Sequence, residues 1–249
     1  MDGWKEPIKA IIDRAVDAGV VGMAVIGIDV ATSERAIELA EEYPHILHAV
    51  VGVQPNHVAA SSDRDFERVA KLTRHRTVRA IGETGLDAYW DDTPMPAQKQ
   101  WFHRHLDLAI ESDLPVVIHM RECCDEVIEL LANRPRNPTC VMHSFTGDAA
   151  QCERLIELGL WFSFAGMLTF KKSEDLREVS RMVPADRLMV ETDSPYLSPE
   201  PLRGKRPNEP ARVVHTLRCL ATAREQSAEA LARQTTENAR RFFGLPAAD

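Results

Sequence analysis

Four short apolar stretches of this sequence each end in a side chain that can bind a metal ion. The four terminal residues are Glu83 in "IGETGLD", His119 in "PVVIHMR", His143 in "MHSFTG" and Asp193 in "VETDSPYL". A single histidine at such a place is usually a hydrogen-bonded polar residue, and a single acid is often the N-cap of a helix. Four together at one place would be costly without a shared cation. We therefore expect these four residues to bind a divalent metal.

The residue types indicate what such a metal would do. Imidazole and carboxylate ligands without a thiolate are typical of zinc, manganese, magnesium or iron sites, and they do not distinguish one metal from another. A carboxylate such as Glu83 can bridge two ions, and two ions a few ångström apart activate a water molecule and stabilise a leaving oxygen. That arrangement hydrolyses phosphodiesters. The expected cofactor is one or two divalent ions, with Mg, Mn and Zn left open.

Basic residues follow the same stretches and are suited to an anionic substrate. Arg121 comes two residues after His119, and Lys205 and Arg206 lie in the loop "LRGKRPNEP" that follows Asp193. Beside a metal cluster they can hold phosphate, because Arg binds it bidentately and Lys acts as a point charge. Taken alone, the loop is equally well explained as a solvated basic segment. The net charge of −8 argues against a broad DNA-binding surface but permits a local phosphate site.

A second histidine motif, "FHRH", looks like a metal-binding pair but is not expected to bind a metal. His103 and His105 look like an H-x-H metal pair, but they lie in a stretch with helical periodicity. Residues two apart on a helix point in nearly opposite directions, so the two rings cannot share an ion. We expect them to be surface or packing residues.

The candidate ligands lie at the ends of predicted strands in an alternating β/α pattern. The predicted strands are 23–28, 47–53, 78–83, 115–119, 140–143, 160–166 and 187–193, and helical patterns lie between them, at 33–43, 97–113 and 149–159 among others. Continuous apolar runs of this length are typical of parallel strands covered on both faces. The pattern predicts an α/β fold, a parallel (β/α) TIM-like barrel, whose working residues lie at the C-terminal ends of the strands. A doubly wound open sheet is the alternative, and the lack of G-x-G-x-x-G after the first strand weighs against it.

The chain begins with a helical pattern where a barrel would begin with a strand. Ile8, Ile11 and Ile12 recur at helical spacing within the first 20 residues, and Gly19 is placed to end the helix. A complete barrel has eight strands, and seven are predicted here. We therefore expect strand 1 to be missing from this chain. The alternative is an added N-terminal helix on an open sheet.

Length and composition predict one soluble domain. A chain of 249 residues suits a single α/β barrel domain spanning 1–249. We find no secretory signal pattern and no apolar run of the roughly 18 residues that a membrane span needs. The five cysteines include no C-x-x-C pair, so reduced thiols are expected. We expect a cytoplasmic monomer that does not contact membranes.

Five motifs carry a resemblance to a known family. "IGETGLD", "PVVIHMR", "MHSFTG", "VETDSPYL" and "RGKRPNEP" resemble, in order and spacing, the signature blocks of the TatD family of metal-dependent deoxyribonucleases. The resemblance implies a (β/α) barrel of the amidohydrolase type that cleaves phosphodiester bonds of DNA, often as an exonuclease on single strands or ends. It also implies that Glu83 bridges two ions, that His119 and His143 complete one site, and that Asp193 belongs to the other. Glu83 and Asp193 would be the catalytic residues, with Asp193 orienting or deprotonating the attacking water.

Two positions depart from the family pattern. The family's first strand ends in an H-x-H pair that holds one ion, and no residue here matches it, which accounts for the count of seven strands. The family block "GVHPH" reads "GVQPNH", with Gln54 where a histidine is usual and His57 displaced. Three explanations compete: a start at an internal methionine of a longer protein, a natural one-metal variant, or a protein that has lost catalysis. We favour the first, because the remaining ligands are all retained.

Three functions are compatible with these residues. The leading one is a metal-dependent hydrolase that cleaves DNA. A hydrolase of another ester or amide could use the same metal-bound water, because fold and metal do not define the substrate. The third, from a different class, is a nucleic-acid-binding barrel without turnover, which would keep binding DNA after chelation or after His143→Ala.

Overall fold

The computed structural model describes residues 5–246 of the chain. Within them, seven parallel strands form one sheet in the order β1-β2-β3-β4-β5-β6-β7. The strands are β1 Met23–Ile26, β2 Leu47–Val51, β3 Val78–Asp87, β4 Val116–Arg121, β5 Cys140–Met142, β6 Trp161–Phe164 and β7 Leu188–Val190. Each predicted strand is thus found, in sequence order. The order never reverses, so the doubly wound alternative, which needs a reversal, is excluded.

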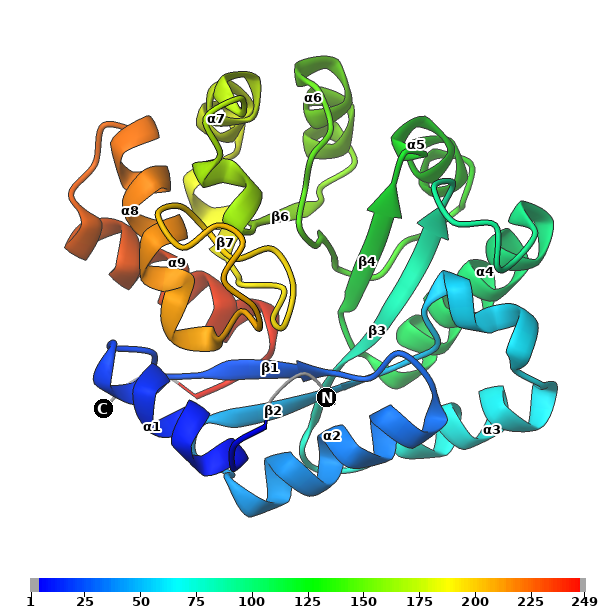
Figure 1. Cartoon of the computed structure of the whole chain (residues 1–249). Coiled ribbons are helices and arrows are strands. Elements are labelled where there is room, and N and C mark those ends of the chain that lie inside the picture. The colour runs from blue at the N-terminus through cyan, green and yellow to red at the C-terminus, as the bar shows by residue number, and fades with distance from the viewer. Residues whose placement is uncertain (1–4, 247–249) are drawn as a thin grey trace.

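Helices surround the curled sheet and follow one another around its outer side (Figure 1). The α-helices are α1 Ile8–Asp17, α2 Val30–Glu42, α3 Asp63–Leu72, α4 Met95–Ser112, α5 Cys124–Ala132, α6 Ala149–Glu157, α7 Glu174–Met182, α8 Val213–Ala223 and α9 Ala228–Phe242. The 3₁₀ turns are η1 Pro55–Ala60, η2 Gly166–Thr169, η3 Ala185–Arg187 and η4 Pro210–Arg212. Together the strands and helices form an open, TIM-like half-barrel, as the alternating pattern predicts.

Short polar residues define where several helices begin. Asp29, Ser62 and Asp148 each accept a hydrogen bond from the backbone N–H three residues later, at the starts of α2, α3 and α6. In each case the side chain three residues on accepts from the N-cap backbone N–H, which completes a capping box. A cap of this kind stabilises a helix by about 1 kcal/mol. These caps define the first residues of α2, α3 and α6.

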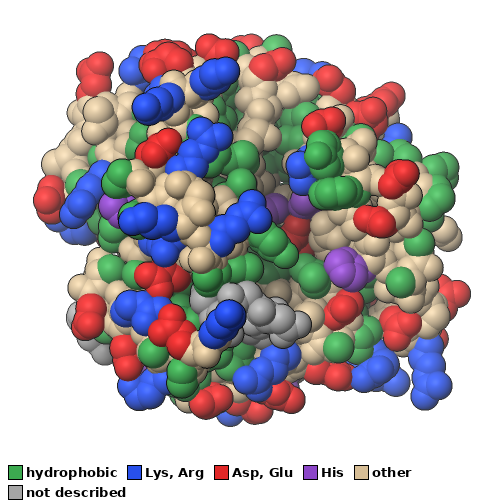
Figure 2. Space-filling view, viewed as in Figure 1, with side chains coloured by type: hydrophobic (Ala, Val, Ile, Leu, Met, Phe, Trp, Pro, Cys, Tyr) green, Lys and Arg blue, Asp and Glu red, His purple; other side chains and the backbone are tan. Residues whose placement is uncertain are grey.

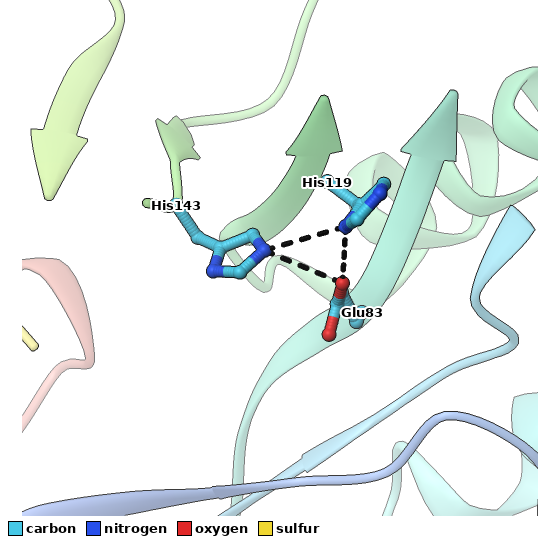
Figure 3. Close-up of side chains that lie close together, drawn as sticks. All are labelled: Glu83, His119 and His143. Atoms are coloured by element: carbon cyan, nitrogen blue, oxygen red, sulfur yellow. Dashed lines mark hydrogen bonds and ion pairs between the residues drawn. The ribbon is translucent and has the colours of Figure 1, made fainter. Parts of the chain in front are cut away.

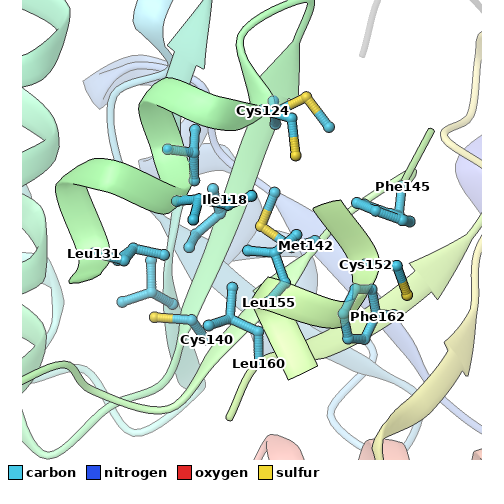
Figure 4. Close-up of a cluster of buried hydrophobic side chains, with 14 of the residues drawn as sticks. Ile118, Cys124, Leu131, Cys140, Met142, Phe145, Cys152, Leu155, Leu160 and Phe162 are labelled. Carbon is cyan, nitrogen blue, oxygen red and sulfur yellow. The ribbon is translucent and has the colours of Figure 1, made fainter. Parts of the chain in front are cut away.

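The largest core cluster lies between the sheet and its outer helices (Figure 4). Ile118 and Met142 from β4 and β5 pack there with Leu131 of α5 and Leu155 of α6, all with at most 2% of their surface exposed. Buried cysteines also lie in this cluster, and the structure records all five cysteines of the chain as free thiols, as predicted. Burial raises the pKa of Cys140 to about 12, so this thiol is unreactive.

The smallest of the three hydrophobic clusters in residues 5–246 lies on the inner side of the curl. Val50, Ala80, Val117, Val141 and Met189 each come from a different strand and meet Phe242 at the end of α9. The inside of the sheet is therefore a packed core and not a channel, as is usual in barrels of this class. A filled interior leaves the C-terminal rim of the strands as the place for chemistry.

The two ends of the sheet are β1 and β7, so the described residues contain seven strands and no eighth strand between these edges. The helix predicted in the first 20 residues is α1, which begins after Pro7, and Gly19 follows it in a left-handed conformation (φ +89°). Part of that predicted helix, residues 1–4, lies outside the described residues. Arg14 of α1 donates hydrogen bonds of 2.8 and 2.6 Å to Glu209 beside η4. This ion pair joins the first helix to the segment after the last strand.

None of the helices in residues 5–246 is long and apolar enough to span a membrane.

Candidate metal centre

The register of the parallel strands brings three predicted ligands to one point of the sheet edge. Glu83 lies in β3, which pairs with β4 so that Gly85 stands opposite His119. His143 directly follows β5, and its backbone N–H donates to the carbonyl of Ile118 in β4 at 3.1 Å. Neighbouring parallel strands run toward the same edge of the sheet, so side chains near that edge come together. The three side chains point toward one another (Figure 3).

The ligand atoms are close enough to share one ion. His119 Nδ1 lies 2.6 Å from Glu83 Oε1, and His143 Nε2 lies 3.3 Å from the same oxygen. The two ring nitrogens are 3.4 Å apart. In residues 5–246 these three side chains are the group that can hold a metal ion, with all ligand atoms within 4.8 Å of one another.

The spacing fits a metal. Two ligands about 2.1 Å from one tetrahedral ion lie about 3.4 Å apart. His143 Nε2 stands near that separation from both partners, at 3.3 and 3.4 Å. The shorter contact between His119 and Glu83 is a hydrogen bond, and binding of a cation in place of the proton would lengthen it. The donor set of two imidazoles and a carboxylate is also typical of divalent metals.

Asp87 holds His119 in the orientation that a ligand needs. His119 Nε2 donates to Asp87 Oδ2 at 2.9 Å, which leaves Nδ1 for Glu83 and an ion. The Asp87 side chain is only 1% exposed and also accepts a hydrogen bond from Asn56 Nδ2 at 3.0 Å. A carboxylate on the distal nitrogen is how proteins orient metal-binding histidines.

Glu191 does the same for the second histidine. His143 Nδ1 lies 3.1 Å from Glu191 Oε1, while Nε2 faces Glu83. Sequence reasoning missed both Asp87 and Glu191 as partners. Asp87 lies in the part of β3 beyond the predicted strand end at residue 83, and Glu191 directly follows β7, so neither was the last residue of a predicted strand.

The electrostatics of the triad follow from its burial. Burial alone would raise the pKa of Glu83, but the charge of His143 and the hydrogen bonds from both histidines hold it well below its usual range. Burial would lower the pKa values of His119 and His143, yet hydrogen bonds and charge from Glu83, with Asp87 for the first and Glu191 for the second, raise both. Without a metal, the protons on the rings thus neutralise the acids.

Asp193 lies near this group but outside the set of atoms that can share one ion. Burial, together with the charges of Glu191 and Glu83, raises the pKa of the Asp193 carboxyl to about 7, against the opposing effect of His143. Its backbone is left-handed (φ 53°), and its carbonyl accepts from the N–H of Tyr196 at 2.8 Å. Such a carboxyl changes its protonation state near neutral pH.

The predicted basic residues lie at the exposed rim. Arg121 ends β4, and its guanidinium carbon stacks 3.7 Å from the ring centre of Tyr89. Lys205 and Arg206 lie in the loop after β7, and within residues 5–246 neither side chain has an ion-pair partner. The carbonyl of Lys205 accepts hydrogen bonds from Ser198 and Arg212, which fix the loop backbone. Figure 2 shows histidine and acidic side chains within a central hollow, with Lys and Arg side chains beside it.

The "GVQPNH" segment leads into the turn η1, whose N-cap is Gln54. Gln54 Oε1 accepts from the backbone N–H of Asn56 and lies 3.1 Å from His57 Nδ1. The glutamine therefore caps the turn, and Asn56 reaches Asp87. The departure from the family pattern at this block has a structural role.

The "FHRH" histidines are surface and packing residues, as predicted. His103 is exposed and accepts from Arg134, whereas His105 is fully buried. His105 Nε2 accepts from the backbone N–H of Val53 at 3.1 Å, and Nδ1 donates to the carbonyl of Trp101 at 2.8 Å. Burial lowers the pKa of His105 to about 4, so this ring is neutral.

The chain is similar to known proteins over nearly its whole length. The family model for TatD-related DNases matches residues 2–244. The chain is 38% identical, over 96% of its length and 93% of the relative's, to the uncharacterized metal-dependent hydrolase YabD of Bacillus subtilis. It is 35% identical, over 95% of its length and 93% of the relative's, to the 3′-5′ ssDNA/RNA exonuclease TatD of Erwinia billingiae. The crystal structure of the TatD homolog YJJV of Escherichia coli superposes with a TM-score of 0.89 at 30% identity, covering 96% of this chain and 92% of the other.

The half-barrel and the two-histidine, one-carboxylate triad at its C-terminal rim define a metal-dependent hydrolase. Both the family match and the relatives extend over nearly the whole chain. The protein belongs to the TatD-related DNase family.

Proposed function

We propose that this protein is an exonuclease that hydrolyses phosphodiester bonds of single-stranded DNA or at DNA ends, using a metal-activated water. The observation that carries the proposal is the convergence of Glu83 Oε1, His119 Nδ1 and His143 Nε2 within 3.4 Å of one another. A relative 35% identical to this chain is named a 3′-5′ ssDNA/RNA exonuclease. Divalent ions supply a nucleophilic water and stabilise the leaving oxygen.

In this proposal Glu83, His119 and His143 would hold one divalent ion, and Glu83 and Asp193 would contribute to a second ion site. Asp87 and Glu191 fix the two imidazole rings through their second nitrogens. Asp193 accepts the proton of the attacking water at its carboxylate. The position of Asp193 beside the triad, where burial and the charges of His143 and Glu83 influence its pKa, supports that role.

Arg121, Lys205 and Arg206 bind the substrate in this proposal. Arg121 is the last residue of β4, and Lys205 and Arg206 lie in the loop after β7, at the same edge of the sheet as the triad. With a net charge of −8 on the whole chain, positive potential at this rim must come from such local residues and from the bound metal. The proposal takes residues 1–249 as one domain, supported by a sheet in which every strand pairs with its sequence neighbour.

The test is release of nucleotides from end-labelled single-stranded DNA by the full chain, with Mg²⁺, Mn²⁺ or Zn²⁺ and a chelator control. We expect metal-dependent release that is lost in His143→Ala. Release that persists in His143→Ala would overturn the role of the triad. Folded protein that binds DNA in chelator, and releases nothing with any of the metals, would favour the binding protein without turnover.

A further inference from the structure

We propose that Tyr89, Trp90 and Arg121 form a stacking platform for an unpaired nucleobase of single-stranded nucleic acid, next to the metal centre. The inference rests on the proposed function for its choice of nucleic acid as the ligand. The platform adds a base-binding site to a centre whose other residues are proposed to bind phosphate and metal.

The three side chains already form a stacked group. The guanidinium carbon of Arg121 lies 3.7 Å from the ring centre of Tyr89 and 5.7 Å from that of Trp90. The two aromatic rings meet edge to face, with centres 4.8 Å apart and planes at 89°. Aromatic rings and guanidinium planes are the surfaces on which proteins stack unpaired bases.

The platform is exposed where a ligand could reach it. Tyr89 is 49% exposed and Trp90 50%, which is unusual for side chains of this size. In residues 5–246 the other aromatic side chain of comparable exposure is Tyr196, at 63%. Tyr196 follows Asp193 on the loop after β7, so these exposed rings all come from loops at the C-terminal edge of the sheet. Scattered surface aromatics would have no reason to gather there.

One carboxylate ties the platform to the metal centre. Asp87 Oδ1 accepts the backbone N–H groups of Tyr89 at 2.8 Å and Trp90 at 3.0 Å, while Oδ2 accepts from His119 Nε2 at 2.9 Å. A base stacked here would thus belong to a nucleotide beside the one at the triad.

The loop that carries the rings is held rigidly before any ligand arrives. Gln98, 1% exposed, accepts from the N–H of Asp87 and donates to the carbonyls of Asp87 and Thr93. The N–H of Ala88 donates to the carbonyl of Arg121 at 2.9 Å. A preformed loop loses little conformational entropy on binding, which favours affinity.

The local charge favours a neutral base over a phosphate at this spot. Asp91 and Asp92 follow Trp90, Glu122 follows Arg121, and all three acids are exposed. A phosphate would be repelled by these carboxylates, whereas the face of a base carries no net charge. The guanidinium group of Arg121 stacks on the Tyr89 ring, so we assign its contact with the substrate to the base and not to a phosphate.

The experiment compares two single-stranded oligomers of equal length, oligo(dT) and an abasic deoxyribose-phosphate chain, binding to the full chain in chelator. Both carry the same backbone charge, so the ratio of their affinities isolates the base. We expect oligo(dT) to bind about tenfold more tightly, because stacking on an aromatic side chain contributes about that much per base. It should also quench tryptophan fluorescence, and the abasic chain should not.

Variants locate the effect. Trp90→Leu and Tyr89→Leu should bring the affinity ratio close to one, and Trp90→Phe should restore most of it because a ring is retained. Arg121→Lys keeps the charge but loses the stacking plane, so it should lower the ratio too. The matched control is Tyr43→Leu, a tyrosine at the end of α2, before β2 and therefore at the opposite edge of the sheet. It should leave the ratio unchanged.

A ratio near one in the wild type would overturn the platform, and so would a ratio that survives both Trp90→Leu and Tyr89→Leu. These outcomes are independent of hydrolysis, because the binding is measured without metal. Failure of metal-dependent nucleotide release, with the ratio intact, would instead remove the proposed function and leave the base site standing.

Discussion

The floor and the rim of this site are built in opposite ways. The floor consists of the triad and its two supporting carboxylates, whose side chains are at most 22% exposed and whose polar atoms are linked in one network. The rim consists of loop residues, Tyr89, Trp90, Lys205 and Arg206 among them. A buried network contributes through fixed geometry, so the loss of one member is costly. Each exposed charge or ring makes its own small contribution to the free energy of binding. Mutations at the floor should therefore have much larger effects than mutations at the rim.

Removing the central carboxylate should have the largest effect. Glu83 Oε1 contacts both histidines, so Glu83→Gln removes the negative charge that balances a bound cation. We expect the affinity for Mn²⁺ or Zn²⁺, measured by calorimetry, to fall by more than about 100-fold. Losing a carboxylate that only orients a metal ligand already lowers metal affinity by about 10- to 100-fold. Glu122→Gln, an exposed acid just beyond β4, is the control and should bind metal normally. Wild-type affinity in Glu83→Gln would place the metal elsewhere.

The floor should respond to pH and the rim should not. The pKa values of His119 and His143 are raised above 6.5, and that of Asp193 is about 7, so in the metal-free protein all three hold protons at slightly acidic pH. A metal must displace those protons, so affinity should rise with pH by about tenfold or more per unit around neutrality. Calorimetry in buffers of different ionisation heat should show proton release. Metal affinity that does not change between about pH 6 and about pH 8 would contradict this assignment, because the protonated imidazoles must lose a proton before they can bind the metal.

The supporting carboxylates should matter less than the ligands. Asp87→Asn and Glu191→Gln each weaken the hydrogen bond that orients one imidazole, at 2.9 and 3.1 Å. We expect each to lower metal affinity by about 10- to 100-fold with the fold intact. Asp92→Asn, an exposed acid in the same loop as Tyr89, is the matched control. Equal effects of all three substitutions would mean that general charge, and not ring orientation, controls binding.

The sequence predicted the floor better than the rim for a physical reason. Parallel strands bring side chains near their C-terminal ends to one edge of the sheet, so Glu83, His119 and His143 could be grouped without coordinates. The strands themselves were predicted to within a few residues, except that β3 continues to Asp87 where the prediction ended at residue 83. Residues 84–87 pair with β4 beyond a register shift, which an apolar run does not reveal. That extension hid Asp87 as the partner of His119.

The arrangement of the rim depends on loop conformations that spacing does not encode. Arg121 was predicted from its position after His119, but its stacking on Tyr89 arises from a turn closed by Asp87 and Gln98. The interaction of Glu191 with His143 spans 48 positions of sequence. A useful signal for the loop would have been two large aromatic residues directly after a strand that ends in a ligand.

The smallest effect is expected from the basic loop. Lys205 and Arg206 are free of ion pairs within residues 5–246, so each contributes only screened attraction to a phosphate. Replacing both with Gln should weaken single-stranded DNA binding by about tenfold at low salt and reduce the salt slope by about 0.7 for each phosphate that is no longer neutralised. Lys71→Gln on α3, whose last turn precedes β3 at the opposite edge, is the control. A salt slope unchanged by the double substitution would show that the loop is solvated and that the metal centre attracts the substrate.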